Sequence, residues 1–162
     1  MPPTKDNFRK AMGRFATGVT VITTGIDGEI HGMTANAITS VSLEPMMLLL
    51  CVDHTADSHD ILSRAGVFAV NILAEEQEAI SDRFATKETD DAHGLDGVPH
   101  TIGETGAPIL DGVLAYLDCR TVTTQETGDH TIFIGEVVDA GYAEYGNPLL
   151  FYGGQYGRIA NA

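Results

Sequence analysis

The first segment of the chain has the apolar spacing of an amphipathic helix, and the next has the composition of a strand. Between Asp6 and Ala16, Phe8, Met12 and Phe15 recur at i, i+4 and i+7, which predicts a helix capped by Asp6. The β-branched run VTVITT follows and predicts a strand, because such side chains are favoured on a pleated surface.

Several further strands are predicted before the middle of the chain. Asp27-Gly28 is a hairpin signal, so the chain is expected to return antiparallel through Glu29–Met33. The alternating segment Ala35–Ser42 predicts a third strand. Met46–Val52 is continuously apolar, which is typical of a strand buried on both faces.

The rest of the chain adds two helices, a long loop and more strands. Helices are expected over residues 58–64, ending at Gly66, and over residues 75–84, with an apolar stripe of Ala79, Ile80 and Phe84. The polar stretch 86–106, which holds Asp90, Asp91, His93 and His100, reads as a loop that could contain a short strand. Strands are expected at 67–73, 113–122, 130–138 and 148–152, with a turn at Gly128-Asp129. Seven or eight strands, three helices and no βαβ repetition favour a mainly antiparallel β-barrel with flanking helices.

Composition indicates one soluble domain covering residues 1–162. The chain is 43% apolar and has 23 acidic against 9 basic residues, a net charge of −14. Such a charge repels phosphate backbones and acidic bilayers, so neither a nucleic acid nor a membrane is expected as a partner. The start lacks the pattern of a signal peptide, which predicts a cytoplasmic protein. Cys51 and Cys119 lie in apolar runs and are expected to be small core residues.

Familiar catalytic and metal motifs are missing from the sequence. It contains no HExxH, GxSxG, GxxxxGK[ST] or GxGxxG pattern, and His54 and His59 have only a weak metal-binding spacing. No metal site is therefore expected.

Two segments and the tail could form a ligand site. GMTANAITSVS, Gly32 to Ser42, offers small residues, hydroxyl groups and accessible main-chain amides, which suit a flat ligand or a phosphate; it could equally be a solvated strand. His130 opens a strand beside a turn, where it could reach a cleft or lie on the surface. The tail YGGQYGR, Tyr152 to Arg158, could cover a ligand or be a mobile terminus.

Six motifs in register resemble the short-chain flavin reductases of the FMN-binding split-barrel superfamily. They are FRKAMGRFATGVTVITT, HGMTANAITSVSLEP, FAVNIL, GAPILDG, GDHTIFIGEV and PLLFYGGQY, and they extend from about Phe8 to Tyr156. The reductase component of two-component aromatic monooxygenases, such as phenol hydroxylase, is the nearest likeness. The resemblance implies a homodimeric Greek-key split β-barrel that binds FMN or FAD and takes hydride from NADH or NADPH.

The resemblance also implies roles for particular residues. The flavin ring is expected along residues 33–37, and its phosphate and ribityl groups near two serines and the end of the 46–53 strand. His130 is expected to contact the nicotinamide and is the one residue assigned to the catalytic site. The tail is expected to cover the nicotinamide. The full expected flavin- and nicotinamide-binding set is Met33, Thr34, Ala35, Asn36, Ala37, Ser40, Ser42, Cys51, Val52, Asp53, Ser58, Phe84, Ala85, His130, Gly154 and Tyr156.

This chain departs from the family at two places. His54 stands where many relatives carry Lys or Arg near the phosphate, so hydroxyl groups and amides are expected to bind more of it. Gln155 and Gly157 replace basic or aromatic residues of some relatives, which leaves NADH or NADPH open. Two rival interpretations are a flavin-binding electron carrier of the flavoredoxin kind, without a nicotinamide site, and a barrel that has lost its ligand. For the reductase, a partner monooxygenase would receive the reduced flavin.

Overall fold

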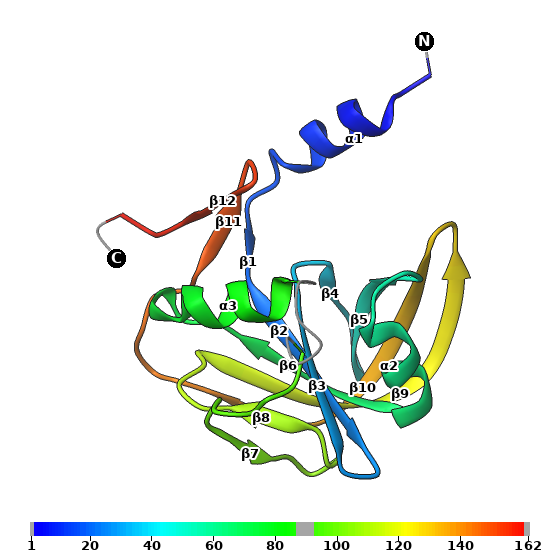
Figure 1. Cartoon of the computed structure of the whole chain (residues 1–162), viewed down its shortest axis with the longest axis vertical. Coiled ribbons are helices and arrows are strands. Elements are labelled where there is room, and N and C mark those ends of the chain that lie inside the picture. The colour runs from blue at the N-terminus through cyan, green and yellow to red at the C-terminus, as the bar shows by residue number, and fades with distance from the viewer. Residues whose placement is uncertain (1, 87–92, 161–162) are drawn as a thin grey trace.

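The computed structural model describes residues 2–86 and 93–160 and forms a barrel-like antiparallel sheet with short helices around it (Figure 1). Asp90 and Asp91 of the predicted loop lie outside the described residues. The seven-stranded sheet has the order β3 (Glu29–Ala35), β2 (Thr20–Ile26), β6 (Val67–Ile72), β9 (Ala115–Thr127), β10 (His130–Tyr142), β5 (Met46–Asp53), β4 (Ile38–Leu43). All pairings are antiparallel, which confirms the predicted fold class.

The barrel is split between β3 and β4. These two strands form the edges of the sheet, yet they follow each other in the chain and are joined only by Asn36 and Ala37. The predicted strand over 35–42 was therefore placed too early, because the chain turns at this link before pairing with β5. The split leaves the link at the surface.

Smaller elements complete the fold. A three-stranded sheet contains β1 (Thr17–Gly18), β11 (Leu150–Tyr152) and β12 (Gln155–Gly157), and a hairpin contains β7 (His100–Ile102) and β8 (Pro108–Leu110). The helices are α1 (Lys5–Met12), α2 (Ser58–Ala65) and α3 (Glu78–Ala85), with a 3-10 turn, η1, at Glu75–Gln77. None of the described helices is long and apolar enough to cross a bilayer.

The first helix differs from its prediction in its ends and its packing. It starts after Thr4, whose hydroxyl accepts the Asn7 N–H at 3.1 Å, so Thr4 and not Asp6 is the cap. It ends at Met12 rather than Ala16, and its apolar face does not contact the core. Phe8 is 64% exposed, and Met12 and Phe15 are exposed as well. Figure 1 shows α1 extending away from the barrel.

Two further expectations about burial are wrong in part. Side chains of β5 alternate between buried and partly exposed, so this strand has only one face in the core. Cys51 lies on the outer face of β5 and is therefore only half-buried, whereas Cys119, on β9, is fully buried as expected. In the predicted 75–84 helix, a 3-10 turn precedes α3, and Ala79 is exposed while Phe84 is buried.

The predicted turns are confirmed where glycine or a special backbone conformation is needed. Asp27 and Gly28 both have positive φ, 52° and 82°, as a two-residue hairpin requires. Gly66 ends α2 with φ 66°. The β9–β10 hairpin turns at Gly128-Asp129, but both strands run four or five residues beyond the predicted ends at Val122 and Val138.

Candidate functional site

The link between the two edge strands carries main-chain donors that the fold does not use. The Ala37 carbonyl accepts the Cys51 N–H at 3.0 Å, which fixes the link against β5. Within residues 2–86 and 93–160, neither the N–H of Asn36 nor that of Ala37 is hydrogen-bonded. Both residues are exposed, so these N–H groups can donate hydrogen bonds to a ligand.

A cavity of about 190 Å³ lies beside this link and brings together residues from distant parts of the chain. Five of its lining residues were predicted from the sequence: Thr34, Ala35, Asn36, Ala85 and Tyr156. Val19, Ser81 and Phe151 line it as well and were not predicted, because they meet the others only through tertiary packing.

The cavity wall is held by hydrogen bonds between β3, α3 and the tail. The Thr34 hydroxyl donates to the Ser81 carbonyl at 2.6 Å. The Tyr156 hydroxyl lies 2.7 Å from the Ser81 hydroxyl and donates to Asp82 Oδ1 at 2.9 Å. Burial raises the pKa of Tyr156, so the phenol stays protonated and can donate at neutral pH. The tail is thus an ordered strand fixed to α3.

A wider groove of about 560 Å³ continues from the link toward α1. Predicted residues Asn36, Ala37, Cys51 and Gly154 line it, together with apolar side chains of α1, β4, β5 and β11. The sequence predicted an apolar face on this helix, but none of its residues was predicted to border a groove.

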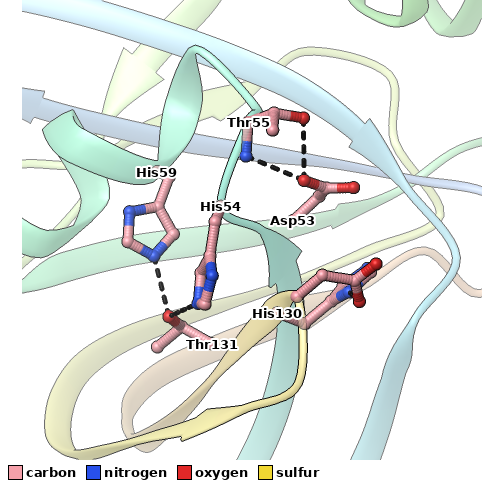
Figure 2. A network of polar contacts seen from close by, with 7 residues as sticks. Asp53, His54, Thr55, His59, His130 and Thr131 are labelled. Carbon is pink, nitrogen blue, oxygen red and sulfur yellow. Dashed lines mark hydrogen bonds and ion pairs between the residues drawn. The ribbon is translucent and has the colours of Figure 1, made fainter.

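Side chains at the end of β5 form a polar network with the start of β10 (Figure 2). Asp53 Oδ1 accepts both the N–H and the hydroxyl of Thr55, at 2.7 and 2.8 Å. His54 Nε2 and His59 Nε2 lie 3.1 and 2.8 Å from the Thr131 hydroxyl. Both histidines therefore have a protein partner, and no group of three or more metal-binding side chains gathers among the described residues.

His130 lies beside this network, in register with Asp53 at the start of β10. Its Nδ1 is 2.8 Å from Asp129 Oδ1, and this hydrogen bond lowers the pKa of Asp129. A groove of about 450 Å³ is lined by both residues, by Asp53 and by residues of α1. His130 therefore reaches a cleft, as one of the two readings of the sequence requires.

Several predicted residues lie away from these cavities or have buried side chains. Val52, Ser58 and Phe84 are at most 2% exposed, so at these positions only the main chain can reach a ligand. Ser40 and Ser42, on β4, line none of the cavities described above.

Among the predicted residues, Met33 packs against the core and Phe84 lies close to Gly32 on β3. A Cβ atom added to Gly32 would meet the Phe84 ring at 2.7 Å. The glycine thus lets α3, which ends in Phe84 and Ala85, lie directly on the strand.

A pair of stacked histidines supports β3 from the other side. The rings of His31 and His93 are 4.7 Å apart, and His31 Nε2 lies 2.7 Å from the Ser58 hydroxyl. Burial, followed by repulsion from His93, lowers the pKa of His31 to about 4. His31 is therefore neutral at pH 7, and it joins β3 to the start of α2.

The donor set fits an uncharged, planar, oxygen-bearing ring such as that of a flavin. Two unbonded main-chain N–H groups, at Asn36 and Ala37, can donate to ring carbonyl oxygens. Ala35 and Ala85 leave room beside them, and Phe151 adds an aromatic surface. Apolar walls with a few directed donors are typical of cofactor sites.

Comparison with known proteins agrees with this donor set. Residues 12–160 match the family described as flavin reductase like domain. The chain belongs to this family. It is 40% identical over 152 residues to the reductase subunit HsaB of a flavin-dependent monooxygenase from Rhodococcus jostii, covering 94% of this chain and 76% of that subunit. It is also 40% identical over 153 residues to an NADH-dependent flavin reductase from a Rhodococcus species, covering 93% and 84% of the two chains.

A solved structure gives the same result for the flavin reductase fold. The NADH:FAD oxidoreductase SgcE6 of Streptomyces globisporus, in complex with NAD and FAD fragments, superposes with a TM-score of 0.91 at 41% identity. The match covers 99% of this chain and 96% of that one. The family predicted from the sequence motifs is therefore confirmed, and with it the split-barrel fold.

Proposed function

We propose that this flavin reductase family member is an NADH:flavin oxidoreductase that reduces FMN or FAD. Flavin and nicotinamide supply the redox chemistry, in which a hydride passes from the nicotinamide ring to the flavin ring. The observation that carries the proposal is the Asn36-Ala37 link with its two unbonded N–H groups: Asn36 lines both the cavity and the groove, and Ala37 lines the groove. NADH, rather than NADPH, is proposed from the names of the Rhodococcus and Streptomyces relatives.

The protein's own residues bind, orient and exclude water. Asn36 and Ala37 donate their N–H groups to the flavin ring, and the half-buried Cys51 borders the same groove. Tyr156 holds the tail against α3 and closes one wall of the cavity. No side-chain acid or base is needed for hydride transfer, so alignment and exclusion of water are what the site must provide.

His130 is proposed to orient the nicotinamide. Asp129 accepts from Nδ1, which leaves Nε2 as an acceptor on the neutral ring. The groove lined by His130 shares Phe8 and Arg9 of α1 with the groove beside the Asn36-Ala37 link. A nicotinamide bound near His130 can therefore lie next to a flavin held at the Asn36-Ala37 link.

The proposed state is a single-domain, cytoplasmic homodimer that passes reduced flavin to a partner monooxygenase. Support for the dimer comes from exposed apolar side chains on α1 and at the β4–β5 edge, where Leu43 is 81% exposed. Large exposed apolar surface indicates an interface. Support for the partner comes from the name of the Rhodococcus jostii relative. Sedimentation at micromolar concentration tests the dimer, and a monomer would exclude it.

The activity is tested by mixing the purified protein with FMN or FAD and NADH without oxygen. Rapid loss of the oxidised-flavin absorbance near 450 nm is expected, at a rate far above that of the mixture without protein. Flavin that binds but is not bleached would support the electron-carrier alternative. If neither FMN nor FAD binds, both the reductase and the electron-carrier function are excluded.

A further inference from the structure

Positive charge in this acidic chain is concentrated at its start. Lys5, Arg9, Lys10 and Arg14 are four of the nine basic residues, and Asp6 is the only acidic residue before residue 27. The remaining chain is therefore even more acidic than the net charge of −14 suggests. An anionic ligand that approaches this protein is attracted to α1 and repelled by most other surfaces.

The Arg9 side chain, like that of Lys5 and unlike those of Lys10 and Arg14, has no hydrogen-bond or ion-pair partner among the described residues. Lys10 pairs with Asp6 at 2.7 Å, and Arg14 donates to the Tyr152 hydroxyl at 3.3 Å. The Arg9 guanidinium makes neither a hydrogen bond nor an ion pair with any residue the structure describes. A guanidinium presents five donors in a planar fork, which matches a phosphate group.

Arg9 also lies where the grooves of the site meet. It lines the 560 Å³ groove together with Asn36 and Ala37, and the 450 Å³ groove together with His130. It lines a third groove, of about 630 Å³, with Gly153 and Gly154 of the β11–β12 turn. A single side chain is thus adjacent to the link, to His130 and to the tail.

The turn facing Arg9 has an accessible main chain. Gly153 and Gly154 have φ of 59° and 83°, and a Cβ on either would meet nothing within 4 Å. The Gly153 N–H donates to the Gly13 carbonyl at 2.9 Å, which fixes the turn to the end of α1. Because the Gly153 N–H is already used, the turn offers a phosphate close approach to an open, side-chain-free backbone rather than a pair of free N–H groups.

We propose that Arg9 binds the phosphate of a nucleotide cofactor, in the groove between α1 and the Gly153-Gly154 turn. The proposal rests on the flavin reductase function proposed above and assigns its phosphate contact. On the His130 side of Arg9 the groove is lined by Lys5 but also by Asp53 and Asp129, whose carboxylates repel a phosphate. On the glycine side Lys10 and Arg14 line the groove with Arg9 and no acidic residue does, which places the phosphate there. The phosphate can belong to the flavin nucleotide or to the nicotinamide dinucleotide, since both carry this group.

Binding of riboflavin, FMN and NAD⁺ to Arg9→Gln tests the proposal without any measurement of turnover. Riboflavin and FMN share the ring and differ in the phosphate, so the ratio of their Kd values isolates the phosphate contact. Quenching of flavin fluorescence gives these two constants, and calorimetry gives that of NAD⁺. Arg120→Gln is the matched control, because it removes the same charge from an exposed position that lines none of these grooves.

If the flavin supplies the phosphate, Arg9→Gln weakens FMN binding about tenfold, equal to about 1.4 kcal/mol, and leaves riboflavin binding unchanged. If the dinucleotide supplies it, the Kd of NAD⁺ rises by a similar factor and the riboflavin-to-FMN ratio is unchanged. Equal Kd values for Arg9→Gln and the wild type toward FMN and NAD⁺ would overturn the proposal. An equal loss of affinity in Arg120→Gln would also overturn it, because the effect would then come from the net charge of the protein and not from the position of Arg9. Failure of the wild type to bind any flavin would instead refute the function.

Discussion

Gly32→Ala is expected to disturb both the fold and the candidate flavin cavity through one contact. The added Cβ would lie 2.7 and 2.8 Å from two carbon atoms of the Phe84 ring, whereas packed carbon atoms lie about 3.5–4.0 Å apart. Phe84 is 1% exposed, so its ring has no free space into which to move. The ring, and with it the end of α3, must therefore shift by about 1 Å, at a cost typical of an overpacked core, about 1–3 kcal/mol.

The shift has two measurable consequences. For a chain of this length, a loss of about 2 kcal/mol lowers Tm by about 4–8 °C. Because Ser81 and Ala85 of α3 line the cavity, the Kd for FMN is expected to rise about three- to tenfold, equal to about 0.7–1.4 kcal/mol. Thermal unfolding followed by circular dichroism and a fluorescence titration with FMN measure the two effects.

Gly135→Ala separates the local effect from general destabilisation. Its Cβ would meet Phe68 at 2.6 Å and Cys119 at 2.9 Å, two core side chains that line none of the cavities described above. A similar fall in Tm with an unchanged Kd is expected for this variant. Gly18→Ala, which has open space around it, should change neither. The reasoning is refuted if Gly32→Ala keeps the wild-type Tm, or if Gly135→Ala weakens FMN binding equally.

Two further predictions concern histidines. The pKa of His31 falls from 6.5 to about 4 on folding, so only the unfolded chain takes up this proton between those values. The contribution of His31 to the free energy of unfolding is therefore complete above pH 6.5 and is lost as the pH falls to 4. The loss is about 3 kcal/mol at most, and about 1–2 kcal/mol for a half-buried ring. Urea unfolding at pH 7.5 and 4.5 should show this loss, and His31→Gln should reduce it; an equal loss in the variant would assign it to other groups. His130→Ala is expected to raise the KM for NADH several-fold with little change in flavin Kd, measured by steady-state kinetics and titration, and an unchanged KM would remove His130 from the site.

Local chemistry explains which parts of the fold could be predicted from the sequence. The Asp27-Gly28 hairpin and the helix end at Gly66 depend on backbone conformations that few other residues adopt, so the sequence specifies them directly. The strand predicted over residues 67–73 is also found, at Val67–Ile72, with its middle residues buried. Such features need no knowledge of distant neighbours.

Burial on the second face of an element could not be predicted in the same way. An apolar stripe on α1 and a continuous apolar run in β5 both indicate contact with something apolar, but not with what. In the structure both border the same 560 Å³ groove, so their outer faces remain accessible. The tail strand β12 was also not predicted: its pairing with β11 is local, but the bond that fixes it, from Tyr156 to α3, joins residues 74 positions apart.

The candidate cavity likewise forms only through tertiary packing of segments that are distant in the sequence. The segment Gly32–Ser42 was identified from its small and hydroxyl-bearing residues, but the hydroxyl of Thr34 faces the protein and donates to Ser81. The Asn36 side-chain amide likewise donates to Thr17 at 3.2 Å. What this segment offers a ligand is therefore its main chain, which becomes available because the barrel splits there and leaves two N–H groups without a partner strand.

This arrangement also explains how so acidic a chain can hold a flavin, whose ring carries carbonyl oxygens. Main-chain N–H groups bind carbonyl oxygens without adding charge, so the ring needs no basic residue near it. A phosphate gains from a positive charge in addition to hydroxyl groups and amides, and Arg9 of α1 lines the same groove. Ring and phosphate would thus be recognised by separate parts of the chain, and a variant at one should leave binding at the other intact. A link variant such as Ala37→Pro, which removes one N–H, should weaken riboflavin and FMN by the same factor, whereas Arg9→Gln should change only their ratio.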